Sequence, residues 1–379
     1  MIENHEARCR INTLYVHHKE ADNPLVQHVL TAHPNVEVVR IQQNTHAWKD
    51  EYGLISLEPK DRFREKRDKA AVLHRNAKWR PDPNGNSTDF LPTLMMSEGC
   101  GFGCTYCYTE RHYKNNYMKL FGDVFKVVDM MAETMGNLEF WRSKMQSLCR
   151  KDFERHRDPK HSDFVTFDLG CDSDCTLDNQ MTMHDGYAGH VVDVMNRASL
   201  IPHCMTSFAT KSAAVDSFVR HVQRPGHHRI RLSLMPESHR RILEINTANI
   251  TARLEAVNKL VRAGFEVHIN LSPIVVTENY ETEYPDLLQL IDDVLTPEAK
   301  QQMAYEVIFL THTTGESEIV QQYAPKAHNM MCNGVLPLVP KPNKPNVLSY
   351  SRPDKKRLKL QLQEWVEQIT PYARIRYNY

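Results

Sequence analysis

Three cysteines stand close together in the stretch Cys100-Gly-Phe-Gly-Cys104-Thr-Tyr-Cys107, a C-x3-C-x2-C spacing. Their thiolates can converge on one site only if the backbone wraps tightly around it. Glycine at every second position from 99 to 103 gives the chain that freedom. Three soft sulfur ligands suit an iron–sulfur cluster or a zinc ion. Because only three thiolates are local, a four-iron cluster held here would leave one iron open to a ligand from outside the protein.

A zinc site and a disulfide are the competing uses of these cysteines. A zinc ion would need a fourth ligand, and His112 lies five residues after Cys107. A disulfide is disfavoured, because the acidic N-terminus lacks the basic and then apolar order of a signal peptide, and a reducing cytoplasm keeps thiols free. No stretch approaches the roughly 18 uninterrupted apolar residues of a membrane span. We therefore expect a cytoplasmic protein without a membrane segment.

Strand-like and helix-like patterns alternate around the cysteine stretch. Six short apolar runs have strand character, at residues 91–97, 163–169, 204–210, 229–234, 266–271 and 305–310. Helical patterns lie between them, clearest over 250–263, where Gly264 is a plausible helix stop. Such alternation predicts parallel β/α units, arranged as an open sheet or as a full or partial barrel. Six units fall short of an eightfold barrel, so we predict an α/β fold with a partial (β/α)6 TIM-type barrel.

The chain divides into three parts on this interpretation. Residues 1–85 form a small N-terminal α/β unit, with a strand at 11–16, a helix at 25–32, a strand at 36–41 and then a basic linker. Residues 86–325 form the barrel. Residues 326–379 form a C-terminal extension, in which a proline-rich loop at 336–346 precedes a helix at 354–369 and a strand at 373–377.

The charge is balanced overall but uneven along the chain. The 379 residues hold 47 Lys and Arg against 47 Asp and Glu, which argues against nucleic-acid binding by a uniform basic field. Two local basic segments remain, with a net charge of +6 over 60–80 and of +4 over 352–379. The first either meets phosphates or forms the solvated face of a charged helix. The second, interleaved with tyrosines, suits nucleic acid modestly.

The cysteine spacing, in a loop after the first barrel strand and with an aromatic residue before the last cysteine, resembles that of the radical S-adenosylmethionine (SAM) superfamily. The resemblance implies one [4Fe–4S] cluster on Cys100, Cys104 and Cys107, whose open iron binds SAM. Reduction by a donor such as flavodoxin or ferredoxin then yields a 5′-deoxyadenosyl radical that abstracts hydrogen from a substrate. In such enzymes the cofactor carries the chemistry, and the protein supplies orientation and excludes water.

Further motifs narrow the resemblance to the spore photoproduct lyase family. They occur in that family's order and spacing, within roughly residues 10–325, and read Cys104-Thr-Tyr-Cys-Tyr108, Phe167-Asp-Leu-Gly-Cys171-Asp-Ser-Asp174, Phe208-Ala-Thr-Lys211, Ile230-Arg-Leu-Ser233 and Ser272-Pro-Ile274. The resemblance implies that Cys171 returns a hydrogen atom to a thymine-derived radical, assisted by Tyr106 and Tyr108. It also implies that three polar residues contact SAM, namely Ser173, Lys211 and Ser233. The substrate implied is DNA or a thymine-derived nucleotide.

Two departures from the lyases shape the expected reaction. Asp172 adds a negative charge beside Cys171, where the lyases have Thr. Residues 335–345 match the lyases' DNA-binding hairpin but are rich in proline, which removes ladder donors and disfavours a regular hairpin. We therefore expect an isomerase that rearranges a substituent on thymine in DNA, as in phage thymidine hypermodification, in the cytoplasm of a bacterium or a phage-infected host. The alternatives are a spore photoproduct lyase and a non-catalytic, zinc-containing nucleic-acid-binding protein.

Overall fold

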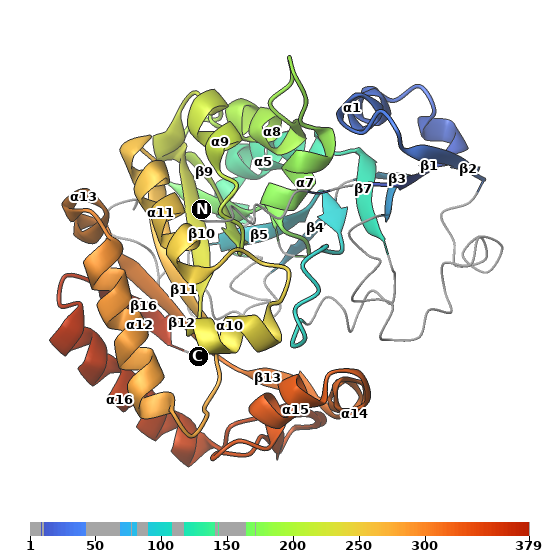
Figure 1. Ribbon diagram of the computed structural model, residues 1–379. Coiled ribbons are helices and arrows are strands. Elements are labelled where there is room, and N and C mark those ends of the chain that lie inside the picture. The colour runs from blue at the N-terminus through green and yellow to red at the C-terminus, as the bar shows by residue number, and fades with distance from the viewer. Residues whose placement is uncertain are drawn as a thin grey trace, which may run out of the picture.

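The computed structural model describes residues 9, 11–42, 69–76, 78–81, 90–107, 117–140, 143, 164–170 and 172–378. They form three β-sheets, with α-helices packed around the largest (Figure 1). Strands and helices alternate along the chain, as predicted for an α/β protein. No helix within these residues combines the length and the apolar character that crossing a bilayer requires.

The largest sheet has eight strands in the order β16-β12-β11-β10-β9-β8-β5-β4. Their bounds are β4 (Lys78–Pro81), β5 (Phe90–Met95), β8 (Val165–Asp168), β9 (Cys204–Thr210), β10 (His228–Leu234), β11 (Glu266–Ile274), β12 (Ala304–Phe309) and β16 (Arg374–Asn378). Neighbours from β5 through β16 are parallel, and β4 runs antiparallel to β5. The six strands β5 and β8 to β12 correspond to the six predicted runs. The sheet curls into a half-barrel, which confirms the predicted partial barrel.

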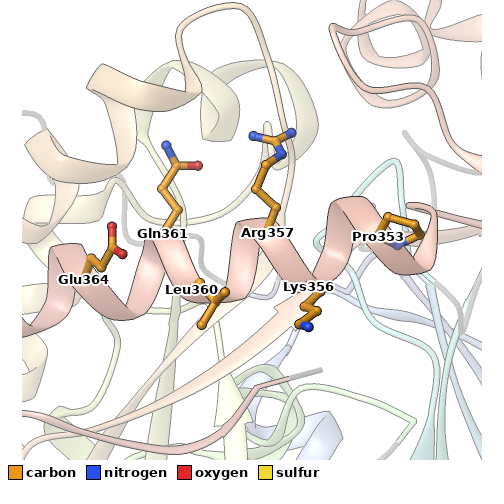
Figure 2. Close-up of a pocket in the computed structure, with 6 residues that line it drawn as sticks. All are labelled: Pro353, Lys356, Arg357, Leu360, Gln361 and Glu364. Carbon is orange, nitrogen blue, oxygen red and sulfur yellow. The ribbon is translucent and has the colours of Figure 1, made fainter.

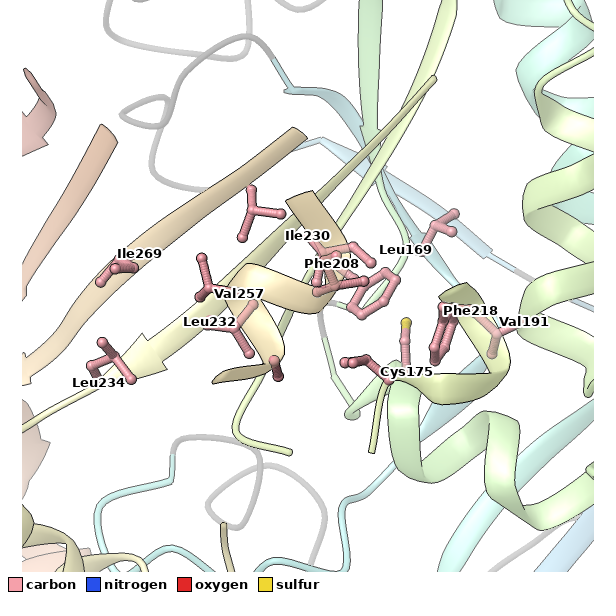
Figure 3. Packing of buried hydrophobic residues seen from close by; sticks show 14 of the residues in the cluster. Leu169, Cys175, Val191, Phe208, Phe218, Ile230, Leu232, Leu234, Val257 and Ile269 are labelled. Carbon is pink, nitrogen blue, oxygen red and sulfur yellow. The ribbon is translucent and has the colours of Figure 1, made fainter. Parts of the chain in front are cut away.

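Helices cover one face of this sheet. They are α5 (Lys126–Gly136), α7 (Cys175–Thr182), α8 (His190–Ala198), α9 (Asp216–His221), α11 (Ile250–Arg262), α12 (Tyr280–Val294) and α13 (Pro297–Gln301). Three further helices, α10 (Glu237–Leu243), α14 (Thr314–Tyr323) and α15 (Pro325–Cys332), lie beyond the ends of the strands (Figure 1). On β10, alternate residues Ile230, Leu232 and Leu234 are buried against Val257 of α11 and the apolar core around it (Figure 3). Every second side chain of a strand therefore packs against the one apolar face of a helix.

The bounds of α11 follow from its end residues. The side chain of Asn249 caps the first turn by accepting a hydrogen bond from the Ala252 amide at 2.8 Å. At the other end Gly264 has φ +91°, a left-handed conformation that glycine adopts without strain. Gly264 therefore ends the helix where the sequence predicted.

The opposite face of the sheet carries buried charges. Arg229 pairs with Glu266 at 2.7 Å, and Arg231 pairs with Asp168 at 2.9 Å and with Glu306 at 3.4 Å. Although burial acts to raise the pKa of Glu306, the guanidinium groups of Arg231 and Arg376 hold that pKa well below its usual range. This charged network joins β8, β10, β11, β12 and β16 across the curled sheet.

A second sheet has the order β2-β1-β3-β7-β6. Its strands are β1 (Thr13–His17), β2 (Glu37–Ile41), β3 (Lys69–Asn76), β6 (Ser97–Glu98) and β7 (Met118–Asp123), and α1 (Pro24–Ala32) connects β1 to β2. The predicted strand–helix–strand unit near the N-terminus is confirmed. Because β6 and β7 follow position 85, this sheet also uses chain from the predicted barrel segment, and the division into three domains stays a prediction.

The interpretation of residues 60–80 as a charged helix face is wrong for the described part of that segment. Residues 69–76 and 78–81 are strands β3 and β4. Within β3 the run 70–73 is fully or almost fully buried between β1 and β7. Four consecutive apolar residues suit a central strand better than an exposed helix. Residues 60–68 lie outside the described residues.

A hairpin forms near the C-terminus but it is irregular, in line with the expectation that its prolines disfavour a regular one. Strands β14 (Val339–Lys341) and β15 (Lys344–Ser349) pair antiparallel around a two-residue turn at 342–343, and β13 (Thr311–Thr313) pairs with the other side of β15. Pro340 lies on the edge strand β14, where one side needs no ladder donor. Pro345 precedes the part of β15 that pairs with β13. Pro340 and Pro345 therefore occupy positions where a missing N–H costs little, and the pairing register shifts between Pro340 and Lys341.

The chain ends with α16 (Arg352–Ile369) and β16, as predicted. The sequence did not indicate that β16 extends the main sheet beside β12. A shallow hollow follows the outside of α16 (Figure 2). Its lining residues are Pro353, Lys356, Arg357, Leu360, Gln361 and Glu364. Part of the basic segment 352–379 is therefore on the molecular surface.

Replacing Arg231 with methionine tests the charged network. Arg231→Met should lower the free energy of unfolding by about 3–5 kcal/mol, because it removes the cation shared by Asp168 and Glu306. Urea unfolding followed by circular dichroism measures the loss. Lys259→Met is the matched control, since it breaks a pair with Asp216 whose side chains are 48% and 53% exposed. The control should cost less than about 1 kcal/mol, and equal losses in both variants would contradict a structural role for the network.

Candidate active site

The cysteine loop begins directly after β6 and runs from residue 99 to 107. Gly99 has φ +88° and Gly103 has φ +60°, so the backbone turns sharply on either side of Cys100. The side chains of the three cysteines pack around Phe102 and around Leu177 of α7, in one small cluster. Cys104 is buried, whereas Cys100 and Cys107 are partly exposed. The loop therefore gathers the three predicted ligands in one place.

The donor set fits an iron–sulfur cluster. Burial raises the pKa of the Cys100 and Cys104 thiols, while the ammonium group of Lys211 acts to lower that of Cys104. No three His, Cys, Asp or Glu side chains in the described parts of the chain lie where one metal ion could join them. In a four-iron cluster each thiolate binds a different iron atom, so such convergence on a single ion is not needed. His112, the possible fourth zinc ligand, lies outside the described residues.

The loop is held from two directions. The Gly99 amide donates to the Asp172 carbonyl at 2.9 Å, which attaches the start of the loop to the segment after β8. The Thr105 amide donates to the Leu243 carbonyl at 3.0 Å, which attaches its end to α10. Between these points the side chain of Asn246 donates to the Phe102 carbonyl at 3.2 Å. Segments that follow different strands of the barrel thus fix the position of the cysteines.

Tyr106 is tied to a buried ion pair. Its hydroxyl donates to Glu244, and burial, then Glu244, raises the tyrosine pKa well above its ordinary value. Glu244 in turn pairs with Arg253 at 2.7 Å, and both side chains are fully buried. Arg253 also donates to the main-chain carbonyl of Ser233 at 2.6 Å. A continuous set of contacts therefore joins Tyr106 to the strand that carries Ser233.

Lys211 follows the last residue of β9 and faces the cysteine loop. Its ammonium nitrogen lies 5.8 Å from the centroid of the Tyr106 ring. Burial acts to lower the lysine pKa, but the carboxylate of Glu244 outweighs it and the pKa is raised. The Lys211 amide donates to Asp174 at 3.2 Å, and Asp174 also caps α7 through the Thr176 amide at 3.0 Å. Lys211 is therefore a fixed cation beside the cysteines.

Ser173 makes short contacts with two buried side chains. Its hydroxyl oxygen lies 2.7 Å from that of Ser97 and 2.6 Å from Oδ2 of Asp178. Ser97 also lies 2.5 Å from the same Oδ2. Burial raises the pKa of Asp178 to about 7, against the opposite effect of the two serine hydroxyls. These three residues join β6, the segment after β8, and α7.

The structure brings most of the predicted site residues to the C-terminal ends of the barrel strands. Tyr106 and Lys211 lie together beside the cysteine loop, Ser173 is linked to the residue that begins β6, and Ser233 is reached through Arg253. Cys171 and Tyr108 lie outside the described residues. The catalytic and binding roles assigned to all these residues stay predictions.

Sequence reasoning missed the residues that support the site. Asp178, Glu244 and Arg253 are almost fully buried, and each contacts a predicted site residue or its backbone. No local motif marks Glu244 or Arg253. The four-residue spacing from Asp174 to Asp178 can be read from the sequence. Only the fold shows that Asp178 contacts Ser97 and Ser173.

Comparison with known proteins places these features in a family. The sequence model of the family described as Spore photoproduct lyase matches residues 82–379. A curated spore photoproduct lyase of Bacillus subtilis (strain 168) is 22% identical over 241 residues, which is 62% of this chain and 60% of that protein. One from Clostridium acetobutylicum is 22% identical over 233 residues, or 61% and 60% of the two chains. The matches therefore span 60% of the length of these relatives.

Solved structures of spore photoproduct lyase variants share the fold. One with dinucleoside spore photoproduct has a TM-score of 0.75 at 17% identity, covering 98% of this chain and 100% of that one. Another, with bound AdoMet and dinucleoside spore photoproduct, has a TM-score of 0.74 at 16% identity and covers 97% and 99%. At these identities the likeness concerns the fold. Since the family model matches well over half of the chain, this protein belongs to the spore photoproduct lyase family.

Proposed function

We propose that this protein is a radical SAM lyase that repairs spore photoproduct, a thymine lesion, in DNA. The observation that carries the proposal is the loop that gathers Cys100, Cys104 and Cys107, with Lys211 and Tyr106 beside it. A [4Fe–4S] cluster on these cysteines would, with SAM, supply a 5′-deoxyadenosyl radical when reduced. The partners proposed are DNA and a small electron donor such as flavodoxin or ferredoxin.

Two observations favour the lyase over the isomerase expected from the sequence. The matching family and the similar relatives and structures are all described as spore photoproduct lyases. A different substrate was expected partly because prolines disfavour a regular hairpin at this position, but strands β14 and β15 do pair there, with a register shift between Pro340 and Lys341. Asp172 is the departure that remains, and its side chain is almost fully buried beside the cysteine loop.

The residues of the site have separable roles in this proposal. Lys211, Ser173 and Ser233 bind and orient SAM, since they offer polar groups at the ends of three neighbouring strands. Cys171 returns a hydrogen atom to the substrate radical, and Tyr106 and Tyr108 assist. The Glu244–Arg253 pair holds Tyr106 in place, and the buried surroundings of Cys104 exclude water.

Positive charge gathers where DNA would approach. Lys355 of α16 lies 5.9 Å from the ring centroid of Phe309, which ends β12. Burial, then the neighbouring charges of Lys341 and Lys359, lowers the pKa of Lys355 to about 8. Lys341 belongs to the hairpin and Lys359 to α16. These three lysines lie near the C-terminal end of a barrel strand, the end that carries the site, and suit contact with phosphates.

The reaction is tested by offering two DNAs to the reconstituted protein. Under anaerobic conditions with SAM and dithionite, the spore photoproduct in one DNA should be converted back to thymidine residues. The amino-acid-modified thymidine in the other DNA should stay unchanged. Nuclease digestion and mass spectrometry of the nucleosides give the result. Conversion of the modified thymidine alone would instead establish the isomerase, and no change in either DNA would reject a thymine substrate.

The cluster is tested by Cys104→Ala. The parent protein should bind about four iron and four sulfide ions per chain. The variant should bind far fewer and should lose SAM cleavage, because one ligand of the cluster is missing. Iron and sulfide analysis with visible absorption measures the loss. Cys332→Ala, which changes a partly exposed cysteine of α15, should keep both iron and activity. Zinc in place of iron in the parent protein would instead favour the non-catalytic alternative.

Hydrogen return is tested by Cys171→Ala. The variant should still cleave SAM, because the thiol acts after the substrate radical has formed, but it should release altered thymine products. Chromatography and mass spectrometry of the digested DNA detect the change. The matched control is Cys175→Ala, which removes a fully buried thiol of α7 four residues away and should leave the products unaltered. Normal repair products from Cys171→Ala would remove Cys171 from this role.

A further inference from the structure

The segment at 243–246, where α10 ends, lies directly against the cysteine loop. The Leu243 carbonyl accepts a hydrogen bond from the Thr105 amide at 3.0 Å. Three residues later the Asn246 side chain donates to the Phe102 carbonyl at 3.2 Å. Two hydrogen bonds therefore join the backbone of the cysteine loop to a segment that follows another strand of the barrel.

Ile245 lies on the outer side of this segment. Both of its neighbours turn toward the cysteine loop, since Glu244 accepts from the Tyr106 hydroxyl and Asn246 donates to the loop backbone. The Ile245 side chain is 67% exposed, the largest exposed fraction of any large apolar side chain in the described ranges. Single exposed apolar residues are common on proteins, but this one marks the surface that lies behind the contacts to the cysteine loop.

Positive charge is in excess beside Ile245. Arg241, four residues earlier, has a side chain that is 73% exposed. It shares the carboxylate of Glu237 with Arg240, so that one acid faces two guanidinium groups. Glu283, another acid that contacts α10, is 20% exposed and is bound by two hydroxyl groups. An exposed apolar side chain with a cation at its rim suits a protein partner of negative charge.

We propose that Ile245 and Arg241 form the docking surface for a small acidic electron carrier of the flavodoxin type, which reduces the cluster. The proposal rests on the function proposed above, because a radical SAM enzyme depends on that reduction. One electron leaves the reduced flavin of the carrier and enters the cluster, and no bond forms or breaks in this step. Weak redox complexes bury small interfaces, so one apolar contact with a charged rim is of the right scale.

DNA is the other macromolecule that could approach this end of the barrel. The lysines of the hairpin and α16, Lys341, Lys355 and Lys359, offer several cations in one place, as contact with a phosphate backbone requires. The end of α10 instead offers an apolar side chain, which gains nothing from a phosphate and gains stability when a protein covers it. The chemistry of Ile245 therefore favours a protein partner over DNA.

Two variants test the surface. Ile245→Ser removes the apolar contact, and Arg241→Glu reverses the exposed charge. Stopped-flow visible absorption follows cluster reduction after the cluster-containing protein is mixed with reduced flavodoxin, without SAM or DNA. Each variant should lower the second-order rate constant by about 10-fold, the scale of one lost apolar or charged contact at an interface. Reduction by dithionite should stay nearly unchanged, and calorimetry should show weaker binding of oxidised flavodoxin.

Salt separates the two contributions. Reduction of the parent protein by flavodoxin should slow as ionic strength rises, because salt screens the attraction between unlike charges. Arg241→Glu should remove this dependence, whereas Ile245→Ser should keep it. Leu200→Ser and Arg220→Glu are the matched controls, since Leu200 is 64% exposed after α8 and Arg220 is exposed on α9. Both controls should keep the parent rates with either reductant.

The possible failures are distinct. Parent rates with flavodoxin in either variant would overturn the inference, and so would a parent protein that flavodoxin cannot reduce. Equal losses with flavodoxin and dithionite would assign a structural role to the residue instead. Weaker binding of DNA, with unchanged reduction by flavodoxin, would assign the surface to DNA. Because cluster reduction needs no substrate, these results are independent of repair. Absence of repair by the dithionite-reduced parent protein would reject the lyase, while the rates of cluster reduction would still decide the docking surface.

Discussion

The ion pair between Glu244 and Arg253 connects the parts of the molecule on which the site depends. Both side chains are fully removed from solvent, and a buried pair is tolerated only when further hydrogen bonds satisfy its remaining atoms. Here they are satisfied by Tyr106 on one side and by the carbonyls of Ser233 and Ala248 on the other. The cysteine loop, the end of β10 and the start of α11 are thereby fixed relative to one another without a covalent link. A small shift of any of them would leave a charge unpaired.

The same logic explains why the two faces of the curled sheet differ. The face toward the helices is apolar, and residues such as Leu232 and Val257 gain stability from burial alone. The other face carries Arg229, Arg231 and their acidic partners, which gain little net stability but keep the face polar. A polar interior next to the strand ends suits a charged, hydrogen-bonding cofactor, whereas an apolar filling would exclude it. The barrel therefore keeps this face polar, although apolar side chains there would enlarge its hydrophobic core.

The sequence predicted what depends on neighbours in the chain. The predicted run at 204–210 coincides with β9, because a short apolar segment between turn residues favours a buried strand. The spacing of the cysteines likewise identified the loop that carries them. The sequence could not predict that β16 would lie beside β12, or that β6 and β7 would join the N-terminal sheet, because such pairings depend on distant contacts. Whether a hairpin forms despite its prolines depends on distant contacts too, since Pro340 is tolerated because β14 lies at the edge of its sheet. Asp178 and Glu244 were hidden because their partners lie in other parts of the chain.

Charge balance over the whole chain says little about what the surface binds. Arg229, Arg231 and Arg253 are paired with acids inside the protein, so they add to the total without reaching a ligand. Burial lowers the pKa of Lys355 to about 8, and the neighbouring charges of Lys341 in the hairpin and Lys359 in α16 add to this effect. An approaching phosphate would offset this crowding of positive charge, which is a reason for proposing that DNA is contacted at this place. A net charge of zero therefore does not argue against local contact with DNA, because charges that pair inside the protein do not reach a ligand.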